Sequence, residues 1–295
     1  MTTITATPAR TATRVRFRIP PAPRLLVHAV LIITALLWLE PTVGLLITSL
    51  RAREAISSSG WWMVLAEPRL TLQNYEAVLM AQGMGNAFLN SFKIAVPGTV
   101  LTVFIASLVA YALAWIEFPG RQAIFLIVIT LLVIPIQTTL VPVLQLFNQL
   151  SLTGTYVGIW LAHTGYGLPF AIYLLRNFFA SLPREIMESA RIDGANDWTI
   201  FLRLILPLSV PALASLAIFQ FMWVWNDLLV ALIYLGGKPS VAPMPLTIAN
   251  LTNSLGQGWQ LLTAAAFLSM LLPLIIFFSM QRYFVRGILA GSVKG

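Results

Sequence analysis

Apolar residues run through this chain in six long blocks that are separated by shorter polar segments. Their approximate bounds are 25–50, 86–116, 123–147, 156–179, 206–235 and 261–284. A helix of about 20 apolar residues crosses the roughly 30 Å hydrocarbon core of a bilayer, and each block is long enough to do so. The pattern predicts an all-α, polytopic membrane protein with six transmembrane helices over residues 25–285.

Prolines lie inside these blocks. They are Pro97, Pro135, Pro142, Pro169, Pro211 and Pro273. A spanning helix tolerates proline when neighbouring helices and polar side chains satisfy the backbone groups that the ring leaves free. The prolines therefore indicate a packed bundle of kinked helices and not a set of isolated anchors.

The composition makes lipid the main solvent of the chain. Of 295 residues, 58% are hydrophobic and 9% are charged, whereas an average soluble domain is about 25% charged. The formal charge of +8 fits basic segments beside anionic headgroups, and no basic patch interleaved with aromatic residues indicates nucleic-acid binding. The absence of cysteine excludes disulfides and thiol catalysis.

The Lys and Arg residues set the expected orientation. They gather in residues 1–24, in the segments after the second and fourth blocks, and in residues 286–295. Cytoplasmic segments of membrane proteins carry such an excess. We therefore expect both termini to be cytoplasmic in a cell membrane, with residues 1–24 as a disordered basic tail and 286–295 as a C-terminal tail. The outer segment 51–85 is expected to lie partly in the interface, and the outer segment 236–258 is expected to be irregular.

One cytoplasmic loop has its own helical pattern, SLPREIMESARIDGANDWTIFLRLILP over residues 181–207. Ser181 is expected to cap a first helix, with Pro183 in its first turn. Gly194 suits the left-handed position that ends a helix. Asn196 or Asp197 is expected to cap a second short helix. The pattern predicts a helix–turn–helix on the cytoplasmic membrane face, with Met187 and Ile192 offering apolar contacts to a partner.

The same loop resembles the EAA loop of ABC importer permeases, whose pattern is EAA, three residues, G, nine residues and I-x-L-P. The matching residues are Glu188, Ala190, Gly194, Leu206 and Pro207. Ser189 stands at the second motif position, and Leu204 replaces the isoleucine. The resemblance implies a type I ABC importer permease fold in which Glu188, Ser189, Ala190, Asp193, Gly194, Leu206 and Pro207 couple to an ATPase.

Two further segments are similar to maltose-type carbohydrate permeases within that family. They are Trp225-Asn226-Asp227 and the tail that begins QRYFVRG at Gln281 and ends AGSVKG at Gly295. In that family the tail reaches the ATPase pair, which implies ATPase contacts for Gly291, Lys294 and Gly295. The partners implied are a second, different permease subunit, two cytoplasmic ATP-binding subunits and an extracytoplasmic solute-binding protein. No cofactor is implied, and the chain is not itself an enzyme because it lacks the G-x-x-x-x-G-K-[ST] phosphate loop.

Polar and aromatic residues within the blocks are candidates for a translocation path. They are Gln137, Trp223, Trp225, Asn226 and Asp227. An acid within a membrane costs about 3 kcal/mol or more and marks function by default, but a hydrogen-bonded structural role for Asp227 is equally open. The tryptophans could stack on a sugar or simply pack. His28 and His163 are far apart in the sequence without partner ligands, so no metal site is assigned.

Three functional classes compete. The first is a sugar importer permease, with oligosaccharides and especially α-glucosides favoured by the resemblance, or a glycerophosphodiester as the alternative cargo. The second is an ion-coupled secondary transporter, which usually shows inverted repeats or several intramembrane charges. The third is an intramembrane enzyme, which needs converging acid, base or nucleophile side chains in the spans. The 181–207 loop favours the first class.

Overall fold

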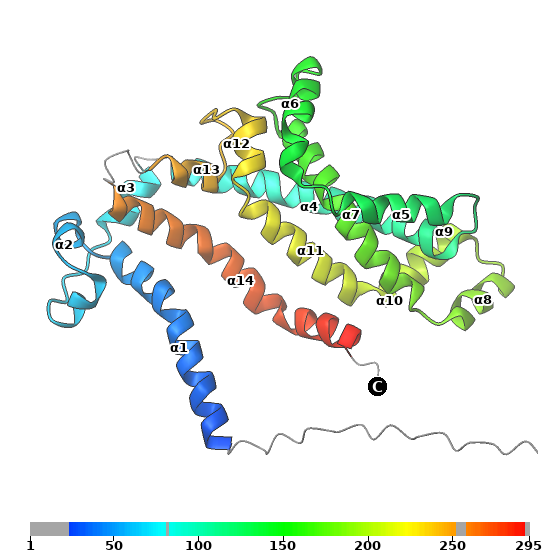
Figure 1. Ribbon diagram of the computed structural model, residues 1–295, viewed down its shortest axis with the longest axis horizontal. Coiled ribbons are helices and arrows are strands. Elements are labelled where there is room, and N and C mark those ends of the chain that lie inside the picture. The colour runs from blue at the N-terminus through cyan, green and yellow to red at the C-terminus, as the bar shows by residue number, and fades with distance from the viewer. Residues whose placement is uncertain (1–23, 81–82, 252–257, 293–295) are drawn as a thin grey trace, which may run out of the picture. The chain divides into compact units, whose positions relative to one another are not determined.

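The computed structural model describes residues 24–80, 83–251 and 258–292. The chain divides into two compact units, residues 1–44 and 45–295, which are described separately. Helices are the only extended regular elements in the described ranges (Figure 1), and an isolated bridge between Arg51 and Leu70 is the one β pairing among them. The all-α prediction is therefore confirmed.

The first unit is built on helix α1 (Arg24–Ser49), whose last residues belong to the second unit. Its apolar side chains are exposed over most of its length, with Leu25 at 86% and Trp38 at 81%. Pro41 lies inside the helix. A helix of this length and apolar character is suited to hydrocarbon on all sides.

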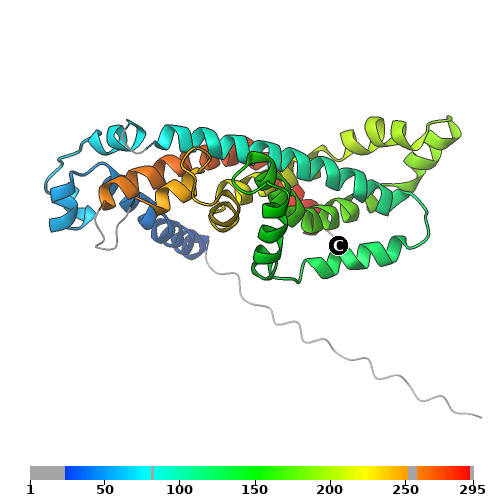
Figure 2. The ribbon, with the colours of Figure 1, turned by 90° about the horizontal axis from the view of Figure 1, so that it is seen from above.

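The second unit is organised around helices α4 (Met84–Trp115) and α7 (Tyr156–Ala180), which lie side by side (Figures 1 and 2). Helix α11 (Val210–Trp225) packs against α4 and α7, and α14 (Trp259–Ser292) packs against α11. Pro97, Pro169 and Pro273 lie inside α4, α7 and α14. These four helices form the frame that positions the polar groups described below.

Within the described residues, three helices are long and apolar enough to cross a membrane on their own: residues Leu25–Ser49 of α1, α4, and residues Trp259–Ser279 of α14. A fourth span is obtained when Asp197–Leu208 and Val210–Trp225 are taken together, across a bend of 75°. Helix α7 is long enough but is diluted by polar residues such as His163 and Thr164. Six complete spans therefore remain a prediction.

The third apolar block is broken. Helix α5 (Arg121–Leu131) is followed by the 3₁₀ turn η2 (Ile136–Thr138) and helix α6 (Leu140–Gln149). Residues 123–147, predicted as the third span, therefore do not form one continuous helix. The cause is Pro135, which has extended backbone (φ −62°, ψ 129°) at the start of η2 and has no N–H to continue a helix.

The fifth block is also interrupted. It is approached by α9 (Asp197–Ile200), the π-helical segment η3 (Phe201–Ile205) and α10 (Leu206–Leu208), and the chain then bends at Ser209 into α11. A second break at residues 226–228 separates α11 from α12 (Leu229–Leu235). Broken backbone in a membrane persists only where polar partners satisfy it, which makes these breaks informative.

The outer segments are more ordered than the sequence indicates. Residues 51–80 contain α2 (Arg53–Ser58), the 3₁₀ segment η1 (Trp61–Leu65) and α3 (Gln73–Met80). The segment 236–258, expected to be irregular, contains the short helix α13 (Met244–Ala249). Its start is fixed because the Met244 amide donates to Ser91 Oγ of α4 at 2.8 Å.

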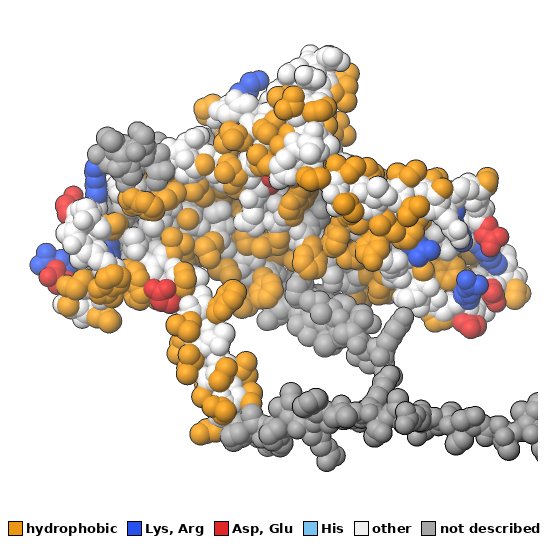
Figure 3. Space-filling model, in the orientation of Figure 1, with side chains coloured by type: hydrophobic (Ala, Val, Ile, Leu, Met, Phe, Trp, Pro, Cys, Tyr) orange, Lys and Arg blue, Asp and Glu red, His pale blue; other side chains and the backbone are white. Residues whose placement is uncertain are grey.

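Two buried clusters form the core of the second unit. One joins α4, α7 and α11 to α12–α14 and includes Trp225 and Tyr234. The other joins α4, α7 and α11 to the segment 184–205 and includes Phe179 and Phe201. In Figure 3 the hydrophobic side chains fill the middle of this unit, and most charged side chains gather over α8 (Arg184–Ile192) and over the region of α2.

Candidate functional site

The 181–207 loop folds as two helical segments joined by a turn, as predicted. Helix α8 (Arg184–Ile192) has Pro183 at its N-cap position, with no side-chain cap. The expected cap, Ser181, instead donates from Oγ to the Phe178 carbonyl and ends α7. The expectation that Ser181 caps α8 is wrong. Its hydroxyl is used in the final turn of α7, and Pro183, two positions later, takes the N-cap position of α8.

Gly194 ends α8 in the left-handed conformation, with φ +82°. The Ala195 amide donates to the Ala190 carbonyl at 2.9 Å, and the Gly194 amide donates to the Arg191 carbonyl at 3.0 Å. These two bonds form the Schellman motif, in which glycine is preferred because a Cβ strains the left-handed backbone. The predicted role of Gly194 in ending the helix is confirmed.

The turn is fixed on both sides by polar contacts. Asn196 caps α9 by accepting from the Thr199 amide at 2.8 Å, which selects Asn196 from the two residues expected there. Asp197 Oδ1 accepts from Arg191 of α8 and from the Tyr111 hydroxyl of α4, both at 3.2 Å. The turn is therefore held to α4, and the orientation of α8 follows from that attachment.

Helix α8 has one buried face and one exposed face. Met187 is 4% exposed and packs with Phe179 and Ile200, so the expectation that it contacts a partner is wrong. Ala190 is half-buried on the same side. The exposed motif residues are Glu188, Ser189, Asp193 and Gly194. The most exposed large apolar side chains of this loop are Ile192 at 85% and Trp198 at 57%.

Leu206 and Pro207 stand at the end of the loop, in α10. The π-helical segment before them places the Pro207 ring, which lacks an N–H, at the start of a new helical turn. Ser209 is fully buried, and its amide is shared between the Ile205 and Leu206 carbonyls at 3.0 and 3.2 Å. The motif residues thus mark the position where the loop turns into α11.

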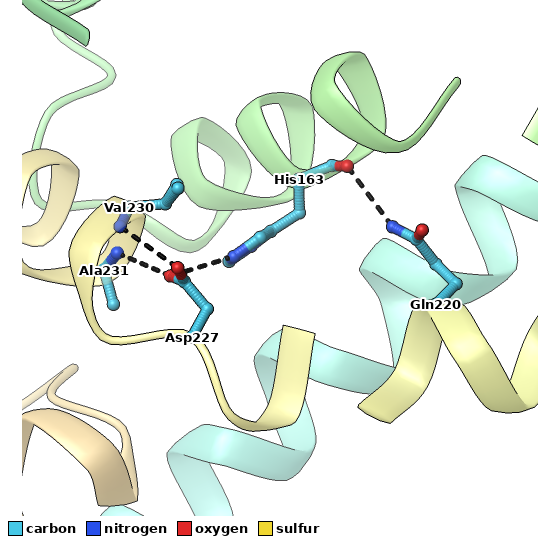
Figure 4. A network of polar contacts seen from close by, with 5 residues as sticks. All are labelled: His163, Gln220, Asp227, Val230 and Ala231. Atoms are coloured by element: carbon cyan, nitrogen blue, oxygen red, sulfur yellow. Dashed lines mark hydrogen bonds and ion pairs between the residues drawn. The ribbon is translucent and has the colours of Figure 1, made fainter. Parts of the chain in front are cut away.

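Asp227 organises the break between α11 and α12 (Figure 4). Its carboxylate accepts from the Val230 amide at 3.3 Å and from the Ala231 amide at 2.9 Å. His163 Nε2 of α7 lies 3.2 Å from the same carboxylate, and the two side chains are 1% and 8% exposed. The acid therefore satisfies amides that the break leaves free and ties α7 to α12.

Gln220 continues this network to α4. Its Nε2 donates to the His163 carbonyl and to Thr102 Oγ1, both at 3.3 Å. The side chain packs directly over Gly167 of α7, where a built Cβ would lie 2.5 Å from Nε2. We call His163, Asp227, Gln220 and Thr102 the polar network. It links α4, α7, α11 and α12 through buried hydrogen bonds.

The predicted path residues do not form one surface. Gln137 and Asn226 are exposed, and Trp223 is 36% exposed with its ring edge-to-face with His163. Trp225 is 1% exposed, packs on Phe221 and donates from Nε1 to the Ser269 carbonyl of α14. The structure therefore places Trp225 in the core, because its indole is enclosed by α14 and its only polar atom is already bonded.

The remaining predicted positions lie in the C-terminal segment. Gly291 belongs to α14, which continues to Ser292, so residues 286–292 are helical. Lys294 and Gly295 lie outside the described residues. Residues 1–23, most of the expected basic tail, also lie outside them.

Sequence reasoning missed His163 as a partner of Asp227 and did not single out Gln220. The available signal was the rarity of polar residues in apolar blocks, since both stand among Leu, Phe and Trp. Buried polar groups need partners, which makes each a candidate for a contact between helices. Their 57-residue separation hides the connection until the helices are packed.

The fold and the 181–207 loop define a membrane permease subunit, and comparison with known proteins agrees. Residues 98–290 match the model of the family described as binding-protein-dependent transport system inner membrane component. The chain belongs to this family. It is therefore a multi-pass permease subunit of an ABC importer that works with a solute-binding protein.

Two relatives illustrate the similarity. The chain is 56% identical over 275 residues, 92% of each chain, to the osmoprotective compounds uptake permease protein GgtD of Synechocystis sp.. It is 58% identical over 233 residues to the alpha-glucoside transport system permease protein AglG of Rhizobium meliloti, covering 77% of this chain and 61% of the relative.

A solved structure shares the fold. It belongs to a bacterial ABC transporter involved in the import of the acidic polysaccharide alginate, with a TM-score of 0.73 and 23% identity. The match covers 90% of this chain and all of that one. The type I permease fold implied by the 181–207 loop is supported by this likeness.

Proposed function

We propose that this chain is a translocation subunit for a neutral carbohydrate, with α-glucosides as the preferred class. The observation that carries the proposal is the 58% identity to the α-glucoside permease, which extends over 77% of the chain. The 56% identity to an osmoprotectant permease supports a second candidate, a compatible solute carried by the same machinery.

The exposed polar groups fit an uncharged cargo. Gln137 and Asn226 are exposed amides, and Asp227, which follows Asn226 in the chain, is enclosed by His163 and two backbone amides. Amides both donate and accept, as sugar hydroxyls do. A glycerophosphodiester carries a negative charge that would favour a cation along its route. This makes the phosphodiester the weaker alternative.

Coupling is assigned to the 181–207 loop, on the cytoplasmic side. Ile192 and Trp198 are exposed apolar side chains in a segment that the distribution of Arg and Lys places outside the bilayer. Exposed apolar patches of this kind mark protein contacts. The proposed partner is the cleft of a cytoplasmic ATPase, which receives the α8 face formed by Glu188, Ser189 and Gly194.

The complex then works as a two-state switch. ATP binding draws two ATPases together, the loops move with them, and the path formed with a second, different permease opens outward to the binding protein. The attachment of the turn to α4 through Asp197 and Tyr111 supports transmission of this movement. ATP is hydrolysed on the ATPase subunits, and this chain supplies no catalytic residue.

Uptake measurements test the cargo. Cells with and without this chain are given a labelled α-glucoside, a labelled osmoprotective compound and a labelled glycerophosphodiester. Loss of α-glucoside uptake alone on deletion is the expected result. Loss of osmoprotectant uptake alone would favour the second candidate, and loss of phosphodiester uptake alone would overturn the neutral-cargo proposal while keeping the importer.

A further inference from the structure

A cavity of about 270 Å³ lies behind α8, outside the polar network. Its walls come from three parts of the second unit: the α4–α5 connection, the last turns of α7, and the side of α8 that carries Met187. Four arginines line it, Arg121, Arg176, Arg184 and Arg191, together with Glu117 and Glu188. The lining therefore carries more positive than negative charge.

The arginines are not neutralised by the two glutamates. Within the described residues, Arg191 pairs with Asp197 in the turn, and neither Glu117 nor Glu188 forms an ion pair with any of the four. The Arg121 guanidinium donates to the backbone carbonyl of Ile116 at 3.2 Å. Uncompensated guanidinium groups that converge on one cavity attract an anion.

Arg176 gives a second, independent indication of a ligand. Its Nε atom is buried without a hydrogen-bond partner among the described residues, while its Nη1 donates to Oδ1 of the neighbouring Asn177 at 3.4 Å. Its guanidinium lies over the Phe125 ring of α5 at 4.4 Å from the centroid. Stacking fixes the plane of the guanidinium, and a buried N–H without a partner is costly, so the group is held ready to donate.

The position of Arg176 also indicates which anion can reach it. It lies four residues before the end of α7 and beside the apolar helix α5, a position that the predicted spans put at the membrane interface. Arginine side chains at this depth reach the phosphates of anionic lipids. The fork of a guanidinium matches two phosphate oxygens.

We propose that this cavity binds a phosphate group, presented by the headgroup of an anionic phospholipid or by a soluble phosphate. The bound phosphate bridges Arg184 of α8 to Arg176 of α7 and Arg121 of the α4–α5 connection. It thereby fixes α8 to the membrane-embedded part of the subunit. The cytoplasmic location of the cavity rests on the proposed orientation, whereas the binding itself does not depend on the cargo.

Native mass spectrometry of the full-length chain tests the lipid source. The delipidated chain is offered equal amounts of phosphatidylglycerol and phosphatidylcholine, and the ratio retained is measured. We expect a preference for phosphatidylglycerol that falls about fivefold in R176Q and about fivefold in R184Q. Arg184 is exposed on α8, so R184Q keeps the test valid if R176Q fails to fold.

The matched control is R203Q. Arg203 carries the same charge in the same 181–207 loop but does not line the cavity, so its lipid ratio is expected to equal that of the unchanged chain. R176K keeps the charge without the planar fork and is expected to recover only part of the preference. Equal losses in R203Q and R176Q would overturn the proposal, since they would reflect overall charge.

Calorimetric titration with inorganic phosphate, in phosphatidylcholine nanodiscs, tests the soluble source. Phosphate binding that is lost in R176Q and R184Q would support the site and assign it to a soluble phosphate. If the unchanged chain shows no lipid preference and no phosphate binding, the proposal is overturned. If R176Q and R184Q no longer co-purify with the ATPase but retain lipid as before, the proposal is also overturned, and these arginines are assigned to the ATPase contact instead. These tests do not measure uptake, so a negative result would count against the phosphate site and not against the proposed transport function.

Discussion

The 181–207 loop and the polar network differ in how their residues are held. In the loop, the important backbone bonds join residues within six positions of each other, as in the turn at Gly194. In the network, His163 contacts Asp227, and Gln220 contacts Thr102 more than a hundred residues away. The loop exposes most of its motif side chains, whereas the network buries its own. The loop, held by local hydrogen bonds, leaves its side chains free for the proposed partner. The polar network, made of contacts between residues distant in the sequence, holds the broken helices together.

The largest effect on transport is expected at Gly194 of the loop, where an added side chain should abolish uptake and leave the fold intact. No atom lies within 4 Å of a Cβ built there, so the aspartate of Gly194→Asp projects outward into the proposed ATPase contact. We expect uptake to fall to background while the amount of protein in the membrane stays unchanged. Transport assays with immunoblotting of membranes measure both.

Gly236→Asp is the matched control for Gly194→Asp. Gly236 is also left-handed, with φ +64°, and also has open space around its Cβ position, but it follows α12 on the expected outer side. It carries a similar backbone strain of about 1–2 kcal/mol, and we expect uptake to be retained. Normal uptake by a well-inserted Gly194→Asp protein would refute the coupling assignment.

Asp227→Ala should have the largest effect on stability. It leaves His163 and two amides without their acceptor, and loss of one partner from a buried pair costs about 3–5 kcal/mol. We expect a lower free energy of unfolding in mild detergent and less protein in the membrane. In a double-mutant cycle, His163→Ala should cost much less in the Asp227→Ala background than alone. Additive losses would show that the pair does not interact.

Gly167→Ala tests the packing between α7 and Gln220. The added Cβ would approach the Gln220 amide to 2.5 Å, and overpacking of this kind costs about 1–3 kcal/mol. Gly165→Ala on the same helix meets nothing within 4 Å and should be neutral or stabilising by about 0.5–1 kcal/mol. Thermal unfolding in detergent compares the two. Equal unfolding midpoints for Gly167→Ala and Gly165→Ala would contradict the close contact between Gly167 and the Gln220 side chain.

Asn196→Ala should have the smallest effect. It removes the side chain that accepts from the Thr199 amide, which costs about 1 kcal/mol for an N-cap. We expect faster hydrogen exchange confined to residues 197–200, and Asn196→Ser should restore protection. The polar network should exchange as before, since α9 and α12 are stabilised by separate contacts. Faster exchange in α12 would show that the two regions are coupled.

The sequence by itself determined the helical class, the membrane setting and the turn at Gly194. These follow from block length, from hydropathy and from the steric demand of the left-handed backbone, which are properties of neighbouring residues. It also indicated the family, because Glu188, Ala190, Gly194, Leu206 and Pro207 stand at the spacing of the EAA motif.

Tertiary structure decided what the sequence left open. The pairing of His163 with Asp227, the burial of Met187 and Trp225, and the arginine cavity all depend on which helix faces lie together. A proline in an apolar block signals strain, but whether the helix continues, as at Pro97, or breaks, as at Pro135, depends on neighbours that satisfy the backbone. Those neighbours are distant in the chain, and only packing brings them close.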